Sequence, residues 1–87
     1  MKPLKTYIIM PNTDFMELPY GSMERAYPYC GNIGCHNSKK VVKTIINGIV
    51  KQIKDYHKEM IGKHLDLYES DDGSWGKMRY LETIEIR

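Results

Sequence analysis

The 87 residues of this chain are enough for one domain around one hydrophobic core, and we expect a single domain over residues 1–87. The composition, 41% hydrophobic and 28% charged with a net charge of +2, excludes a disordered chain, and no apolar run reaches the roughly 20 residues of a membrane-spanning helix. The N-terminus lacks the features of a signal peptide and there are only two cysteines, so we expect a cytoplasmic protein without membrane contact.

Charge is distributed unevenly along the chain. Residues 1–37 hold three basic and three acidic groups, residues 38–63 hold seven Lys against two acids, and residues 64–87 hold three basic and six acidic groups. The middle of the chain is therefore basic and the end acidic. Either these two parts pair with each other, or the basic part faces an anionic partner.

Residues 4–10 are predicted to form the first strand, because they are rich in β-branched and aromatic residues and lie between two prolines. Apolar side chains on both faces predict a central position in a sheet. Residues 11–37 contain three Pro and three Gly, which predict a long loop with short helical turns near Asp14 and Ser22. A hairpin through residues 17–29 is the main alternative.

One long amphipathic helix is the firmest prediction. Ser38 is a favourable N-cap, with Asn37 as a second candidate, and apolar residues then recur at intervals of three and four. We expect the helix to end near Ile61, before Gly62, although the pattern allows a continuation to Tyr68. The predicted buried stripe consists of Val42, Ile45, Ile46, Ile49, Ile53, Tyr56 and Met60.

Two alternating segments after the helix, residues 64–68 and 77–86, predict a β-hairpin, with Asp72 and Gly73 as the strongest turn pair. The predicted order is strand, long loop, helix, strand, strand. We therefore expect an α+β fold, a small two-layer sandwich in which the amphipathic helix packs on an antiparallel or mixed sheet.

Cys30, Cys35 and His36 form the most suggestive cluster of metal ligands. The C-x4-C spacing with an adjacent histidine is at the edge of zinc-site spacing, and His57 or His64 would have to supply a fourth ligand. A local disulfide and two free thiols are the alternatives. Zinc is thus the one cofactor that the sequence suggests, and otherwise we expect none.

The start of the predicted helix is a candidate anion site. Ser38, Lys39 and Lys40 follow a glycine-rich stretch, and the free N–H groups of a helix N-terminus favour a phosphate. The alternative is an ordinary glycine-rich connection, because the stretch does not match the phosphate-binding loop pattern.

Five lysines of the predicted helix fall within an arc of about 80°, given 3.6 residues per turn, and no acid interrupts their row. Such a row suits a phosphate backbone or an acidic protein surface. The alternatives are a solubilising face that the acidic end of the chain partly neutralises, or one side of a homodimer. We call these residues the lysine stripe: Lys40, Lys43, Lys51, Lys54 and Lys58.

Residues 11–37 are rich in Tyr, Met and Arg, which protein interfaces favour, and contain no lysine. We therefore predict that Tyr20, Arg25, Tyr27 and Tyr29 contact a partner, together with the lysine stripe. The alternative is that these side chains cover the open face of the sheet.

No catalytic motif emerges, so we do not expect an enzyme. The leading hypothesis is a small non-catalytic binding or regulatory protein, an inhibitor or adaptor that acts by protein–protein contact, as many small phage- or mobile-element-encoded regulators do. One alternative is a nucleic-acid-binding module that uses the lysine stripe, although a pI of 8.5 is modest for that class. The other is a zinc-stabilised module.

Overall fold

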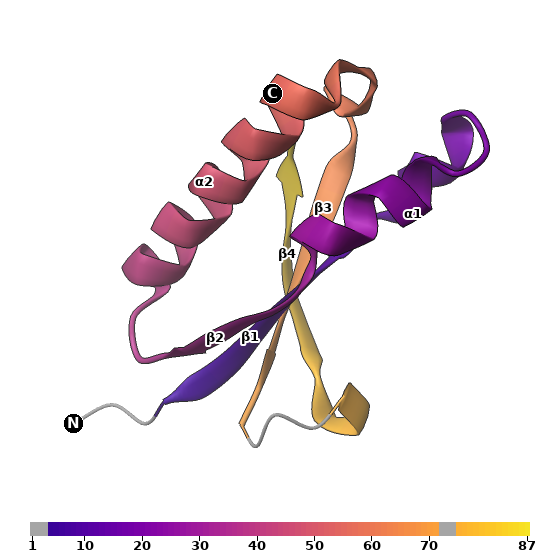
Figure 1. Ribbon diagram of the computed structural model, residues 1–87. Coiled ribbons are helices and arrows are strands. Elements are labelled where there is room, and N and C mark those ends of the chain that lie inside the picture. Colours follow the sequence, from indigo (N-terminus) through magenta and orange to yellow (C-terminus); the bar gives the residue numbers. More distant parts are fainter. Residues whose placement is uncertain (1–3, 72–74) are drawn as a thin grey trace.

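The computed structural model describes residues 4–71 and 75–87, and these form an α+β fold in which a long helix packs against an antiparallel sheet of order β2-β1-β3-β4 (Figure 1). The predicted fold class and the packing of the helix on the sheet are confirmed. The sheet is strongly twisted, so that β1 and β2 cross β3 and β4 in this view. The elements are β1 (Lys5–Pro11), β2 (Gly31–His36), α2 (Lys39–Tyr56), β3 (His64–Ser70) and β4 (Arg79–Glu85).

Strand β1 is central, as its apolar character on both faces predicted. It pairs with β2 on one side and with β3 on the other. Tyr7 and Ile9 face the core beneath α2, and Ile8 is buried outside that cluster. An apolar run without strict alternation favours a strand that is buried on both faces.

Strand β2 corrects the prediction of a loop through residues 11–37. Gly31 and Gly34 adopt positive φ angles of 110° and 104°, and the pairing with β1 shifts by one residue at Ile33. A glycine-rich stretch of this kind can still form an edge strand with a bulge, because only one side of it must pair. The glycines that suggested a break therefore shape the bulge.

Residues 12–30, which we call the connecting segment, join β1 to β2 through three short helices: η1 (Thr13–Glu17), α1 (Ser22–Ala26) and η2 (Tyr27–Tyr29). The predicted turns near Asp14 and Ser22 are confirmed, and the alternative of a hairpin through residues 17–29 is wrong. Phe15 and Ala26 are buried in the core, so the segment is packed against the body of the fold.

Helix α2 begins after Ser38, as predicted, but it ends at Tyr56 and reaches neither Ile61 nor Tyr68. The chain leaves the helix at His57, which has φ −138° and ψ 73°. The backbone N–H of His57 still donates to the carbonyl of the preceding turn, and a second, tighter turn follows. No helix in the described residues, α2 included, is long and apolar enough to cross a membrane.

The apolar stripe of α2 faces the sheet, with corrections at its C-terminal end. Tyr56 is 76% exposed, whereas Met60 is fully buried and reaches the core from η3 (Lys58–Met60). Ile45 and Ile49 are only partly buried. The core cluster consists of Tyr7, Ile9, Phe15, Ala26, Val42, Ile46, Ile53, Met60, Leu65, Leu67 and Ile86.

The predicted hairpin of β3 and β4 is confirmed, while its predicted turn at Asp72 and Gly73 lies outside the described residues. The predicted strict alternation of β4 fails at one point, because Leu67 pairs with Glu82 and the next residue, Tyr68, pairs with Tyr80. Leu81 is the extra residue of this bulge. A bulge changes which face the following side chains occupy.

Candidate interaction surfaces

Polar contacts tie the beginning of the connecting segment to the start of β3. Asp14 Oδ2 lies 2.7 Å from His64 Nδ1, and Asp14 Oδ1 accepts a hydrogen bond from the His64 backbone N–H at 3.3 Å. Lys63 Nζ donates to Glu17 Oε1 at 2.8 Å. Helix η1 is therefore fixed to β3, which is far away in the sequence.

The end of the connecting segment is fixed to the residues that follow α2. The ring of Tyr29 meets the ring of His57 edge to face, with centroids 5.6 Å apart. Arg25 Nη2 donates to Ser22 at 2.8 Å, and Arg25 Nε lies 3.8 Å from a carboxylate oxygen of Glu59. Arg25 thus has partners within the chain, although we predicted that it contacts a partner protein.

The predicted partner-binding tyrosines fall into two groups. Tyr20 is 100% exposed and Tyr27 is 47% exposed, whereas Tyr29 is half-buried and packs against the core. The sequence-based set omitted Met16, which is 78% exposed beside the buried Phe15. The predicted surface of the segment is therefore better described by Met16, Tyr20 and Tyr27.

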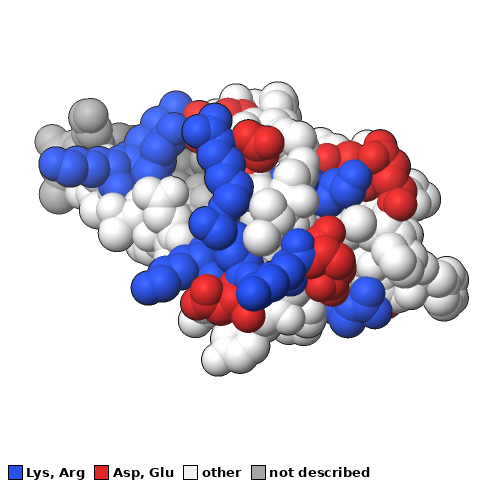
Figure 2. Space-filling view, turned by 90° about the horizontal axis from the view of Figure 1, so that it is seen from above, with Lys and Arg blue, Asp and Glu red and all other residues white. Residues whose placement is uncertain are grey.

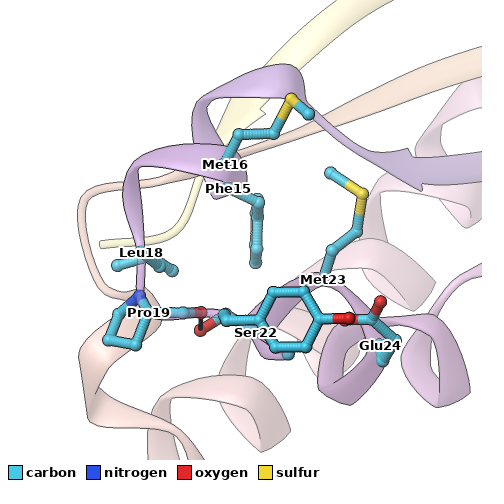
Figure 3. A pocket seen from close by; sticks show the side chains of 9 residues that line it. Phe15, Met16, Leu18, Pro19, Ser22, Met23 and Glu24 are labelled. Carbon is cyan, nitrogen blue, oxygen red and sulfur yellow. Dashed lines mark hydrogen bonds between the residues drawn. The ribbon is translucent and has the colours of Figure 1, made fainter.

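Next to these side chains lies an open depression with a volume of about 230 Å³. Figure 3 shows Phe15 in its middle, with Met16, Met23 and Leu18 around it. The sequence did not predict this depression, because η1 and α1 form it only when they fold against each other. Its lining residues are Phe15, Met16, Leu18, Pro19, Tyr20, Gly21, Ser22, Met23 and Glu24.

The lysine stripe lies on the part of the surface that α2 and η3 form. In Figure 2, basic side chains make a band across the molecule with a few acids beside it. Lys43 Nζ lies 2.9 Å from Glu82 Oε1. Within residues 4–71 and 75–87, the other members, Lys40, Lys51, Lys54 and Lys58, have no ion-pair partner.

The acids near the end of the chain pair mainly with other cations. Arg79 Nη2 lies 2.9 Å from Glu69 Oε1 and 3.0 Å from Asp71 Oδ1. Lys5 Nζ lies within 3.6 Å of Glu69 and 3.8 Å of Asp71. We considered the alternative that the acidic end of the chain neutralises the lysine stripe. Among the described contacts, this applies to Lys43.

Glu69 is held in its charged form by this cluster. Burial by itself would raise the pKa of its carboxyl, but the hydrogen bond from Arg79 and the charge of Lys5 outweigh burial and hold the pKa below its usual value. Burial raises the pKa of the neighbouring Tyr7, and the charge of Glu69 raises it further. These groups stabilise one end of the sheet, and the sequence did not single them out.

The structure does not bring the three predicted metal ligands together. Cys30 is half-buried, and burial raises the pKa of its thiol to about 12, whereas Cys35 is exposed further along β2. His36 Nε2 lies 3.0 Å from the carbonyl oxygen of Ile33. The described residues include every Cys and His of the chain, and no three potential ligands cluster among them. The extended strand keeps the two sulfurs apart, and both cysteines are free, so the predicted alternative of a local disulfide is also not formed.

The predicted anion site is reduced to the first turn of α2. Ser38 is the N-cap, but its side chain makes no capping hydrogen bond, and no acid lies in the first turn beside Lys39 and Lys40. The glycine-rich loop that we expected before it is β2. Only the backbone N–H groups and the two lysines remain of the predicted cradle.

Comparisons of this chain with protein-family models, curated proteins and solved structures gave no match.

Proposed function

We propose that this chain is a small non-catalytic binding protein that acts by occupying a protein partner, as an inhibitor or an adaptor. One observation carries the proposal: large apolar side chains are exposed on a segment whose other side is anchored in the core. Tyr20 is 100% exposed and Met16 is 78% exposed, while Phe15, next to Met16, is 1% exposed. Exposed apolar groups that gather at one place are typical of interaction sites.

The anchoring supports the proposal because binding costs less free energy when the backbone that carries the contacting side chains is already held in place. Asp14 fixes the beginning of the connecting segment to His64, and Tyr29 fixes its end to His57. The exposed side chains between these points therefore project from a supported surface.

The chemistry of the segment also supports a protein partner. Tyr, Met and Arg are enriched in the centres of protein interfaces and Lys is depleted there, and residues 12–30 contain no lysine. One end of the lysine stripe lies next to the connecting segment. Tyr29 contacts His57 and Arg25 faces Glu59, and Lys58 is the residue between His57 and Glu59. A partner that covers the segment would meet the lysines at the edge of the interface.

The test is capture of a partner from a native extract of the source cells by the immobilised protein. We expect the double variant Tyr20→Ala with Met16→Ser to lose a retained protein that the unmodified chain holds. Both side chains are exposed, so circular dichroism is expected to show an unchanged fold. Tyr29→Ala is unsuitable for this test, because Tyr29 packs against the core.

The matched control is Tyr80→Ala. Tyr80 is 57% exposed and lies on β4, at the edge of the sheet opposite β2 and far from the connecting segment in the sequence. Its loss is expected to leave capture unchanged. The proposal fails if the unmodified chain retains no protein that the double variant does not also retain.

Nucleic-acid binding is a second candidate function, and it is favoured by the members of the lysine stripe that have no ion-pair partner in residues 4–71 and 75–87. Lys40, Lys51 and Lys54 lie along one helix of about 27 Å, given a rise of 1.5 Å for each of its 18 residues. Cations along such a length can release the counterions of a phosphate backbone. This reading requires binding that depends steeply on salt.

Fluorescence anisotropy with a labelled DNA duplex tests this second candidate at salt concentrations from about 50 to 200 mM. Lys51→Gln is expected to lower the slope of log affinity against log salt by about 0.9. Arg87→Gln is the charge-matched control, because Arg87 lies outside the stripe and pairs with Glu85. Undetectable binding at the lowest salt concentration would eliminate this candidate.

A further inference from the structure

The depression in the connecting segment has the size of a site for one large side chain. Its volume of about 230 Å³ lies below the roughly 300–1,000 Å³ of pockets that hold small-molecule ligands. It is open to solvent on one side, and Figure 3 shows Phe15 in its middle, with Leu18 and Pro19 to one side and Met23 to the other. Interfaces commonly place a single anchoring side chain in a pocket of this kind.

The lining favours an aromatic occupant. Phe15 is 1% exposed and closes the floor of the depression, while Met16 and Met23 border the space above it. Thioether sulfurs make favourable contacts with aromatic rings, so these two methionines favour an aromatic occupant. Methionine side chains also adapt to the shape of what they contact.

The polar side chains of the lining indicate which group of the partner would lie beside its aromatic ring. Ser22 is buried, and its Oγ already donates to the carbonyl of Pro19 at 2.7 Å and accepts from Arg25 at 2.8 Å. Glu24 is the one charged side chain among the described lining residues.

Glu24 is exposed and has no ion-pair partner in the described part of the chain. The neighbouring acid Glu17 is already neutralised by Lys63 at 2.8 Å. The guanidinium of Arg25, which donates to Ser22 beside the depression, faces Glu59 at 3.8 Å. Glu24 is therefore the charge at the rim that has no ion-pair partner among the described residues, and a cation of the partner would complement it.

We propose that this depression is an anchor pocket for one aromatic side chain of a protein partner that carries a lysine or arginine beside it. The inference rests on the proposed function, because it names the chemistry of the partner that the connecting segment captures. In this proposal the aromatic side chain of the partner contacts Met16 and Met23, and the lysine or arginine beside it pairs with Glu24.

The test uses four short peptides with blocked ends: Gly-Arg-Trp-Gly, Gly-Arg-Ala-Gly, Gly-Arg-Leu-Gly and Gly-Glu-Trp-Gly. Each is titrated into protein with isotope-labelled methionine methyl groups, and NMR follows each methyl resonance. The Trp peptide with Arg is expected to shift the Met16 and Met23 resonances with a roughly millimolar dissociation constant, as one anchor without the rest of an interface would. Met10 and Met60, which do not line the depression, are internal controls and stay in place.

The charge requirement has its own variant. In the unmodified chain, Gly-Arg-Trp-Gly is expected to bind several-fold more tightly than Gly-Glu-Trp-Gly. Glu24→Gln is expected to remove this preference while retaining the shifts of Met16 and Met23. Because Glu24 is exposed, this substitution leaves the core unchanged.

Four outcomes would overturn the inference. These are equal shifts from the Leu and Trp peptides, shifts at Met10 as large as those at Met16, an unchanged preference for Arg in Glu24→Gln, and shifts of Met16 and Met23 on dilution of the protein alone, which would make a second copy the occupant. If peptides bind as expected but the extract yields no partner, the pocket stands and the proposed function fails. If capture depends on Tyr20 and Met16 but the peptides cause no shifts, the proposed function stands and the pocket proposal fails.

Discussion

The connecting segment and the lysine stripe are the two exposed regions that we propose as interaction surfaces, and they are built in opposite ways. In the segment, acids such as Asp14 and Glu17 have partners within the chain, and apolar groups such as Tyr20 are exposed. In α2, Val42, Ile46 and Ile53 are buried, and most lysines have no ion-pair partner among the described residues. A partner thus gains burial of apolar surface at one region and neutralisation of charge at the other.

Because they are built differently, the two regions should respond to different perturbations. The segment depends on side chains that connect it to the core, so core substitutions should release it. The lysine stripe depends on the absence of nearby acids, so it should respond to salt and to charge removal but little to changes in packing.

Phe15→Ala is expected to have the largest effect. Phe15 is fully buried from within the segment, and removal of a buried Phe typically lowers the free energy of unfolding by about 3–5 kcal/mol. Urea denaturation measures this loss. Met16→Ala is the matched control and should change stability by no more than about 0.5 kcal/mol. A loss below about 1 kcal/mol for Phe15→Ala would show that the connecting segment is only loosely attached to the core.

Glu69→Gln is expected to have an intermediate effect, because it removes an acid that pairs with Arg79 and Lys5. A hydrogen bond to a charged group contributes about 1.5–3 kcal/mol. The lowered pKa of Glu69 in the folded state means that its contribution is present above pH 4.5, the ordinary value, and is lost as the pH falls through the lowered value.

Urea denaturation between neutral pH and pH 3 checks this sign. Stability of the unmodified chain should fall as the pH decreases, and Glu69→Gln should show a smaller fall, with the remainder contributed by Asp71, whose pKa is also lowered by Arg79. Glu24→Gln, at an unpaired acid, should keep the full pH dependence. An equal pH dependence in Glu69→Gln and the unmodified chain would remove the explanation for the unpaired lysines.

Lys51→Gln and Lys54→Gln are expected to have the smallest effects. Like charges three residues apart on a helix cost about 0.2–0.5 kcal/mol, so Lys54→Gln should raise stability by that amount at low salt and by nothing at high salt. Lys51→Gln should raise it less, because Asp55 lies four residues after Lys51 on the same helix and attracts it. Lys43→Gln should instead lower stability slightly, because Lys43 pairs with Glu82. The same sign for all three variants would contradict the separation of the stripe into paired and unpaired lysines.

Local pattern was sufficient for the elements whose signal lies within a short window. Ser38 as an N-cap predicted the start of α2, and the apolar spacing of three and four predicted most of its buried face. The two apolar faces of β1 predicted its central place. The alternating segments after the helix predicted the hairpin of β3 and β4. These features follow from backbone periodicity, which neighbouring residues alone determine.

The remaining features were decided by contacts between distant residues. β2 is a strand because β1 offers it hydrogen bonds that offset its glycines, and α2 ends at Tyr56 because Met60 is buried from a separate turn. Likewise, the sequence alone determined that Lys40, Lys43, Lys51 and Lys54 share one face of α2. Only the tertiary structure decided that most of them have no ion-pair partner in the part of the chain that is described. It places Arg79 and Lys5 beside Glu69 and Asp71, and charge pairing depends on distance in space.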